Sequence, residues 1–281
     1  MMTFFLIVLC ILAVLIVWFF IERCILLTRK KEIFLRAWPK ELNGMRILQI
    51  SDLHHRTFGR DNIRISRRVQ RIQPDIIVIT GDLISRDMRD FTAVGRFCRN
   101  LAAIAPVYFV PGNHELDLPS KVRETYYKTL RGANGIILDN RSCSIKSGGG
   151  SVSLVGTTLD ISIYHDGDHK YRNLNPYSKE ELIKQIGVHD GCTILLAHNP
   201  LIAEAYADWG ADLVLCGHVH GGVMHLPFIG GVLSPERRFF PRYSKGLYRI
   251  GDTCMYVSGG LGKIRLFNPS EINLITLRNQ E

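Results

Sequence analysis

The sequence predicts an α/β fold with a mainly parallel β-sheet, preceded by one membrane-spanning helix. Three observations carry this prediction. Apolar strand patterns alternate with helical patterns over residues 45–131, the order that builds a parallel sheet covered by helices. Shorter strand patterns follow from residue 136, and hairpins of this kind indicate antiparallel pairing in a second sheet. Residues 4–21 are apolar without interruption, which is about the length that crosses a bilayer.

The apolar run is interpreted as a membrane anchor over residues 1–24, because a core helix is rarely apolar on every side. A cleaved signal peptide is the alternative, but no basic residue precedes the run and no small-residue cleavage site follows it. Positive charges come only after the run, at Arg23, Arg29, Lys30, Lys31 and Arg36. By the positive-inside rule, we expect a single-pass protein whose main domain faces the cytoplasm.

Residues 25–44 are expected to form a juxtamembrane linker, followed by one domain over residues 45–281. The linker mixes basic residues with Phe34, Leu35 and Trp38. This pattern fits an amphipathic segment on the membrane surface, and it fits an edge strand ahead of the core equally well. With 281 residues, 46% of them hydrophobic, the chain is long enough for one sizeable core.

Net charge and cysteine content indicate the kind of partner and the redox compartment to expect. The formal net charge of +9 suits an anionic partner such as a phosphate ester or an acidic lipid surface. No helix-turn-helix, zinc-finger or aromatic-basic repeat is found, so no nucleic-acid partner is expected. The seven cysteines form no CxxC pair, which argues against a disulfide framework and favours a reducing compartment.

The individual elements follow from the spacing of apolar residues. Strands are predicted at residues 45–50, 75–80, 107–110, 136–138, 143–146, 151–156, 193–197, 213–216, 255–258 and 272–277. Helices are predicted at about 62–73, 91–103, 120–131, 178–187 and from residue 200. Ser178 and Glu181 match a capping box at the start of the fourth helix, and Pro200 is well tolerated in a first helical turn.

Five of these strands end in residues that bind metal or move a proton. The endings are Ser51-Asp52-Leu53-His54, Gly81-Asp82, Gly112-Asn113-His114-Glu115, His198 and Gly217-His218-Val219-His220. One such ending alone fits a plain turn with polar residues, but parallel strands bring their carboxyl ends to one edge of a sheet. Imidazole and carboxylate together suit Zn, Mn and Fe, and a bridging Asp suits a pair of ions. We interpret the five endings as one binuclear metal centre.

In identity and order, the five endings resemble the signature blocks of the calcineurin-like metallophosphoesterases, from about residue 45 to the C-terminus. The resemblance implies a four-layer αββα sandwich of two mixed β-sheets and metal-dependent hydrolysis of phosphoric esters or anhydrides. It also implies the ligands: Asp52, His54 and His220 for one metal, Asn113, His198 and His218 for the other, and Asp82 as the bridge. By the same resemblance, His114 contacts the phosphate and protonates the leaving oxygen, while Glu115 orients His114.

The identity of the metals and of the substrate is less directly indicated by the sequence than the ligands are. We expect two divalent ions, with manganese first and iron or zinc as alternatives, because the ligands accept all three. The anchor, a basic and aromatic loop at residues 223–245, and Gly260-Leu261-Gly262 with Arg265 are similar to the membrane-associated branch that includes UDP-2,3-diacylglucosamine pyrophosphatase-like enzymes. The expected function is therefore hydrolysis of a phosphodiester or pyrophosphate in a lipid-linked substrate. Soluble nucleotides or cyclic nucleotides are the alternative substrates, and a non-catalytic scaffold would be expected only if ligands were missing.

Overall fold

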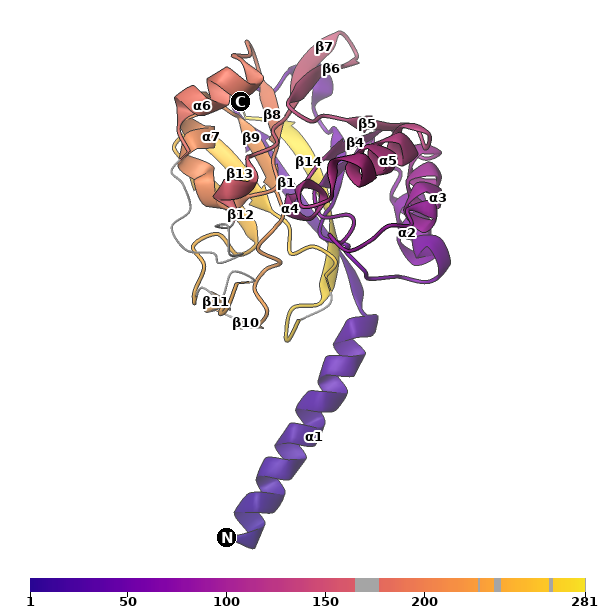
Figure 1. Cartoon of the computed structure of the whole chain (residues 1–281). Helices are drawn as coiled ribbons and strands as arrows, with labels where there is room; N and C mark the ends of the chain where they lie inside the picture. Colours follow the sequence, from indigo (N-terminus) through magenta and orange to yellow (C-terminus); the bar gives the residue numbers. More distant parts are fainter. Residues whose placement is uncertain (165–176, 227, 235–238, 263–264, 281) are drawn as a thin grey trace.

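Two six-stranded mixed β-sheets lie against each other, and a long helix leaves the domain at one side (Figure 1). The computed structural model describes residues 1–164, 177–226, 228–234, 239–262 and 265–280. Successive α/β units build each sheet, so the carboxyl ends of its parallel strands share one edge. The metal-binding sequence motifs lie at these ends.

The first sheet has the order β1-β14-β2-β3-β4-β5. Its strands are β1 (Leu26–Leu35), β14 (Ser270–Asn279), β2 (Arg46–Ile50), β3 (Ile76–Thr80), β4 (Val107–Val110) and β5 (Gly135–Ile137). From β2 to β5 all neighbours are parallel, whereas β14 runs antiparallel to β2 and parallel to β1. The apolar runs of β2, β3 and β4 are buried on both faces, as expected of central parallel strands.

The second sheet has the order β12-β13-β9-β8-β7-β6. Its strands are β12 (Gly246–Ile250), β13 (Thr253–Val257), β9 (Leu213–Cys216), β8 (Thr193–Leu196), β7 (Gly150–Gly156) and β6 (Arg141–Ser147). The four inner strands are parallel, and the two outer strands pair antiparallel with their neighbours. A separate short hairpin, β10 (His225–Leu226) with β11 (Gly230–Gly231), follows the last metal-binding motif.

Helices cover the outer face of each sheet. The first sheet carries α2 (Ile63–Ile72), α3 (Thr92–Ala102) and α5 (Ser120–Arg131), and the second carries α6 (Lys179–Ile186) and α7 (Ala203–Trp209). A third apolar cluster lies between the sheets, where Ile47 and Val78 belong to one sheet and Ile194 and Leu215 to the other. The predicted four-layer αββα arrangement of two mixed sheets is therefore confirmed.

The N-terminal segment differs from expectation in one respect. Helix α1 (Met2–Cys24) is long and apolar enough to cross a membrane, and none of its most apolar 18-residue window is buried. The next residues, however, do not form a free linker between residues 25 and 44, because Leu26–Leu35 pairs with β14 over its whole length as strand β1. Ile33, Leu35 and Trp38 are buried in the apolar layer between the sheets. The first sheet therefore includes residues before residue 45, in agreement with the alternative of an edge strand ahead of the core.

Candidate metal centre

All seven residues expected as metal ligands lie at carboxyl ends of parallel strands or in the turns that follow them. Asp52 and His54 follow β2, Asp82 follows β3, and Asn113 opens the short helix α4 (Asn113–Leu116) after β4. His198 follows β8, and His218 and His220 follow β9. The first sheet therefore contributes four of the seven residues and the second sheet three.

One group of potential ligands consists of Asp52, His54, Asp82 and His220, each with one ligand atom within 4.8 Å of all the others. The Nε2 atoms of His54 and His220 face each other at 3.3 Å, and the two rings are stacked at 9°. Nε2 of His220 lies 3.5 Å from Oδ1 of Asp52. Ring nitrogens and carboxylate oxygens that converge at this spacing form a donor set suited to a divalent transition metal.

A second group consists of Asp82, His198 and His218. Nε2 of His198 lies 3.3 Å from Oδ2 of Asp82, and Nδ1 of His198 lies 2.7 Å from the carbonyl oxygen of Thr80. A carbonyl only accepts hydrogen bonds, so Nδ1 carries a proton and Nε2 is the ring nitrogen directed into the site, an orientation common among metal-binding histidines. The carboxylate of Asp82 belongs to both groups.

Buried atoms without partners fit the same interpretation. Asn113 is 3% exposed and its Oδ1 accepts no hydrogen bond, and Oδ2 of the fully buried Asp52 has no hydrogen-bond partner either. Buried polar atoms in native proteins are normally paired, so two unpaired oxygens beside converging imidazoles fit the role of cation ligands. The residues present therefore fit two divalent ions, and nothing in the donor set selects one metal among manganese, iron and zinc.

The backbone of the site is strained at most of the proposed ligands. Left-handed φ values are found at Asp52 (57°), His54 (53°), Asp82 (52°), His218 (72°) and His220 (56°). A non-glycine residue held in this region costs on the order of 1–3 kcal/mol, and such residues cluster at functional sites. The turns after β2, β3 and β9 thus hold these side chains in directions that relaxed backbone would not give.

Burial and mutual charge set the protonation of the site. Burial raises the pKa of Asp82, but His198, His114 and His54 outweigh it and hold this pKa well below its usual range. Burial lowers the pKa of His54 to about 4 and takes that of His220 well below its ordinary value. For His198, burial lowers the pKa, but the adjacent Asp82 raises it to about 10. The imidazoles of His54 and His220 are therefore neutral at pH 7 and ready to bind a cation, whereas a cation at His198 would displace a proton from its ring.

His114 lies at the rim of the site. Its side chain is 23% exposed, its Nε2 is 3.9 Å from Oδ2 of Asp82, and its ring contacts that of His54 edge to face at 4.4 Å. Its backbone N–H donates to Oδ1 of Asp82 at 2.9 Å. Arg86, which the sequence analysis did not single out, has Nη2 3.3 Å from Nε2 of His114 and an ion pair with Asp117. A partly exposed imidazole and a guanidinium therefore lie together beside the shared carboxylate.

Glu115 does not orient His114 as expected. Its buried carboxylate accepts hydrogen bonds from the backbone N–H groups of Asp82 at 2.9 Å, Gly112 at 2.8 Å and Ile84 at 3.3 Å. Glu115 therefore fixes the turn that carries Asp82, rather than the imidazole of His114. Glu115 and His114 are successive residues of α4, and successive residues of a helix point in different directions.

Of the other aromatic and histidine side chains, some contact the potential ligands and others lie outside the site. Tyr164, at the start of a loop that the sequence analysis left aside, is buried and contacts the rings of His198 and His218 at 6.0 and 5.1 Å. His55 points away and pairs with Asp87 at 2.7 Å, as expected for a residue outside the site. The rest of the Tyr164 loop, including His165 and His169, lies outside the described residues, and so do Arg237 and Arg238.

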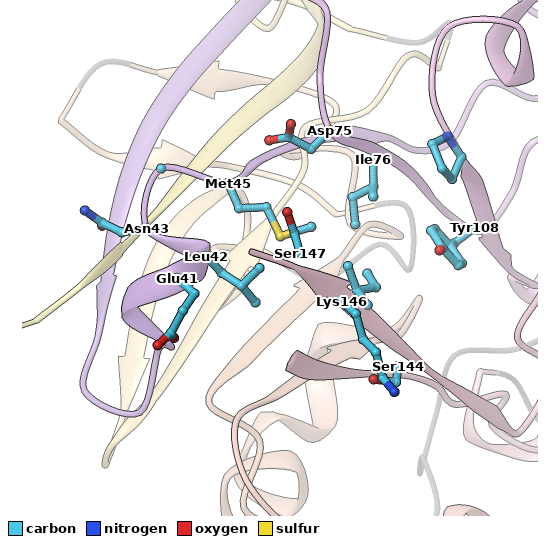
Figure 2. A pocket seen from close by; sticks show the side chains of 13 residues that line it. Glu41, Leu42, Asn43, Met45, Asp75, Ile76, Tyr108, Ser144, Lys146 and Ser147 are labelled. Carbon is cyan, nitrogen blue, oxygen red and sulfur yellow. The ribbon is translucent and has the colours of Figure 1, made fainter. Parts of the chain in front are cut away.

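A pocket of about 560 Å³ lies at the opposite edge of the first sheet (Figure 2). It is lined by residues at the amino ends of strands, among them Met45 and Ile76, and by Ser144 and Lys146 of the β6–β7 hairpin. The potential ligands occupy the carboxyl ends of the same strands, and five strand residues span roughly 16 Å. This pocket is therefore separate from the metal centre.

Comparison with known proteins gives the same family for this arrangement. A family model described as calcineurin-like phosphoesterase matches residues 45–222. Phosphodiesterase YaeI of Escherichia coli (strain K12) is 28% identical over 239 residues, which cover 83% of this chain and 82% of YaeI. The UDP-2,3-diacylglucosamine pyrophosphatase LpxG of Chlamydia muridarum is 26% identical over 281 residues, covering 82% of this chain and 83% of LpxG. A transmembrane protein with a metallophosphoesterase domain from Danio rerio is 30% identical over 88% of this chain and 56% of its own length.

The matched residues take in all five strand endings that carry potential ligands, and the match extends over well more than half of the 281 residues. The layered fold and the donor set agree with it independently. This chain therefore belongs to the calcineurin-like phosphoesterase family and is a metal-dependent hydrolase.

Proposed function

We propose that the protein hydrolyses a phosphodiester or pyrophosphate bond with two divalent ions. One ion is bound by Asp52, His54 and His220, the other by Asn113, His198 and His218, and Asp82 bridges them. The observation that carries this proposal is the Asp82 carboxylate, which belongs to both ligand groups. A carboxylate shared by two histidine-containing groups is the arrangement that a pair of ions requires.

The bound ions, Asn113 and His114 would have different roles in the reaction. A pair of bound ions acidifies water and neutralises charge on phosphoryl oxygens. The neutral amide of Asn113 keeps the negative charge of the ligand set low, which leaves the site attractive to an anionic substrate. His114, partly exposed beside Asp82, is placed to donate a proton to the leaving oxygen.

The direct test is metal removal followed by reloading. The purified protein is stripped with EDTA, reloaded separately with Mn, Fe or Zn, and assayed with bis-p-nitrophenyl phosphate. We expect turnover to disappear on stripping and to return with at least one of the metals. Turnover that survives complete removal of metal would contradict the proposal.

We further propose that the substrate is lipid-linked and is cleaved at the membrane surface. Helix α1 supports membrane attachment. Phe228, Ile229, Phe239 and Phe240 are exposed in the segment that follows the His218 and His220 turn, which favours contact with acyl chains or an interface. The similarity to LpxG, named as a UDP-2,3-diacylglucosamine pyrophosphatase, supports the same substrate class.

A substrate panel separates lipid-linked from soluble substrates. The full-length protein is assayed with UDP-2,3-diacylglucosamine, p-nitrophenyl phosphate, bis-p-nitrophenyl phosphate and cyclic nucleotides, each with the metal that best restores turnover. We expect the largest kcat/KM for the diacylated substrate. A larger kcat/KM for a soluble nucleotide would favour the alternative function.

We also propose that α1 is a single-pass anchor and that the domain from residue 26 onward lies in the cytoplasm. The basic residues after α1 support this orientation, since positive charge is retained on the cytoplasmic side. In intact cells, external protease should leave the domain uncut, and cleavage there would contradict the orientation.

A further inference from the structure

The end of the membrane helix is fixed to the catalytic domain by a buried carboxylate. Glu22 lies in the last turn of α1 and is 2% exposed. Its carboxylate accepts hydrogen bonds from the backbone N–H groups of Phe267, at 2.8 Å, and Asn268. Hydrogen bonds to an ionised acceptor are stronger than neutral ones and set a defined geometry. Helix α1 is therefore joined rigidly to the loop before β14.

The same contacts reach both halves of the metal centre. The side-chain amide of Asn268 donates to the carbonyl oxygens of His220 and Gly222, each at 2.7 Å. On the other side of the helix end, the guanidinium of Arg56, two residues after His54, donates to the carbonyl oxygens of Arg23 and Gly262. The loop that carries His54 is thus tied directly to the last turn of α1, and the loop that carries His220 is tied to it through Asn268.

Aromatic side chains surround this junction and are exposed. Phe267 stacks on Trp18 of α1, with 6.3 Å between ring centroids. Trp18 precedes Glu22 by about one helical turn, so it lies about 6 Å farther from the domain along the axis of α1. Phe267 therefore lies alongside the final turns of the apolar helix rather than above them. Tryptophan is enriched at the membrane interface, where its ring sits at the level of the lipid headgroups.

The β10–β11 hairpin adds to the same surface. Leu266 exchanges backbone hydrogen bonds with Val223 and His225, so the hairpin stands beside Phe267, and Figure 1 shows it on the side from which α1 leaves. At its turn, Phe228 and Ile229 are largely exposed. Phe228 and Phe267 both have a left-handed backbone, with φ of 67° and 56°, which is rare for bulky residues. No burial within the described part of the chain explains an exposed phenylalanine held in this way at the hairpin turn.

We propose that Glu22 locks the domain on its membrane helix, with the edge that carries the metal centre facing the bilayer and Phe228, Ile229 and Phe267 inserted in the lipid interface. The occupant of this aromatic surface is lipid because the surface continues directly into the apolar helix through the Trp18 and Phe267 stack. The proposal rests on α1 crossing a membrane, which belongs to the proposed function, but it does not depend on which phosphoester is cleaved. Glu22 is a positioning residue and touches no substrate.

Fluorescence quenching by lipid tests the orientation without any activity measurement. Full-length protein with Cys10, Cys24 and Cys143 changed to Ser is placed in nanodiscs of phosphatidylcholine and phosphatidylglycerol. An NBD label is attached at Phe228→Cys or, as a matched control, at Val188→Cys, which follows α6 and is 71% exposed. With lipid spin-labelled at acyl carbon 5, we expect several-fold stronger quenching at position 228 than at 188. Equal quenching at the two positions would overturn the proposed orientation.

The role of Glu22 is tested by Glu22→Gln, in which one of the two acceptor oxygens is replaced by an NH₂ donor that faces a backbone N–H group. We expect quenching at position 228 to fall at least twofold while the melting temperature of the domain stays unchanged. Glu22→Asp, which keeps the charge, should retain part of the quenching. Glu32→Gln is the control, because Glu32 on β1 forms an exposed ion pair with Arg278 on β14 and loss of this pair should change nothing. Undiminished quenching in Glu22→Gln would remove Glu22 as the lock, and the contrast between positions 228 and 188 in the unchanged protein would still decide the orientation.

Discussion

A single methyl group added at Gly112 should displace the shared carboxylate of the metal centre. The backbone of Gly112 is extended, with φ of −101°, so alanine meets no conformational obstacle there. Its Cβ, however, would lie 2.3 Å from Oδ1 of Asp82 and 2.8 Å from the Asp82 backbone nitrogen. To restore a normal contact, Asp82 has to move by about 1 Å.

The size of the effect follows from that displacement. A misplacement of about 1 Å in a catalytic arrangement costs on the order of 10²-fold in rate, equivalent to about 2.7 kcal/mol of transition-state stabilisation. We therefore expect Gly112→Ala to lower kcat/KM for bis-p-nitrophenyl phosphate about 100-fold and to reduce the bound metal per chain. Because the clash is local, the far-UV circular dichroism of the domain should be retained.

The matched control is Gly132→Ala at the end of α5, where φ is −66° and the nearest atom to a new Cβ is 3.3 Å away. Kinetics, metal content by mass spectrometry and melting temperature are measured for both variants. Gly132→Ala should behave like the unchanged protein. Full metal content and unchanged kcat/KM in Gly112→Ala would refute the placement of Asp82 against this glycine.

Three further predictions follow from the same structure. His114→Ala should keep its metals, by mass spectrometry, while kcat falls by roughly 10²–10⁴, the usual loss for a general acid; loss of metal would make His114 a ligand instead. Phe239→Ser combined with Phe240→Ser should leave the melting temperature unchanged, because both rings are exposed, and should raise KM only for lipid substrate in bilayers, by about tenfold; this corresponds to about 1.4 kcal/mol, within what partial burial of two rings provides. A chain starting at Leu26 should be soluble without detergent and fold, whereas one starting at Met45 loses β1 and should melt at lower temperature or aggregate. Identical melting curves for the two truncations would contradict the assignment of β1 to the domain.

The fold and the potential ligands were predictable because they depend on patterns that the sequence carries locally. The strand at 107–110, the helix at 120–131 and the strand at 213–216 agree residue for residue with β4, α5 and β9. The five strand endings could be grouped at one edge because parallel strands leave little choice of where their carboxyl ends lie. The ligand roles remain predictions, although the structure brings the named side chains together.

What could not be predicted depends on contacts between distant segments. The segment of β1 was expected to be a juxtamembrane linker, with an edge strand left open, because it mixes basic and apolar residues. Its middle residues, from Arg29 to Glu32, are charged and largely exposed, as is common for edge strands protected against aggregation. Its partner β14 follows more than 200 residues later, and no local pattern indicates that pairing. Strand β12 and the β10–β11 hairpin were missed because their apolar residues do not alternate.

The side chains around the site that were missed have a similar explanation. Arg86 and Tyr164 lie in irregular segments after the motifs, where sequence spacing gives no direction for a side chain. Glu22 carried no prediction, and only the folded chain brings Phe267 and Asn268 to it. Both cases depend on tertiary packing, which overrides local propensity.

The most direct test of the binuclear centre is the metal content of the unchanged protein and of Asp82→Ala, measured together with turnover of bis-p-nitrophenyl phosphate. Because one carboxylate serves both ligand groups, the account predicts close to two ions per chain in the unchanged protein. In Asp82→Ala it predicts loss of metal from both groups and no measurable turnover. An Asp82→Ala variant that is fully loaded and active, or an unchanged protein that is fully active with a single ion, would contradict it.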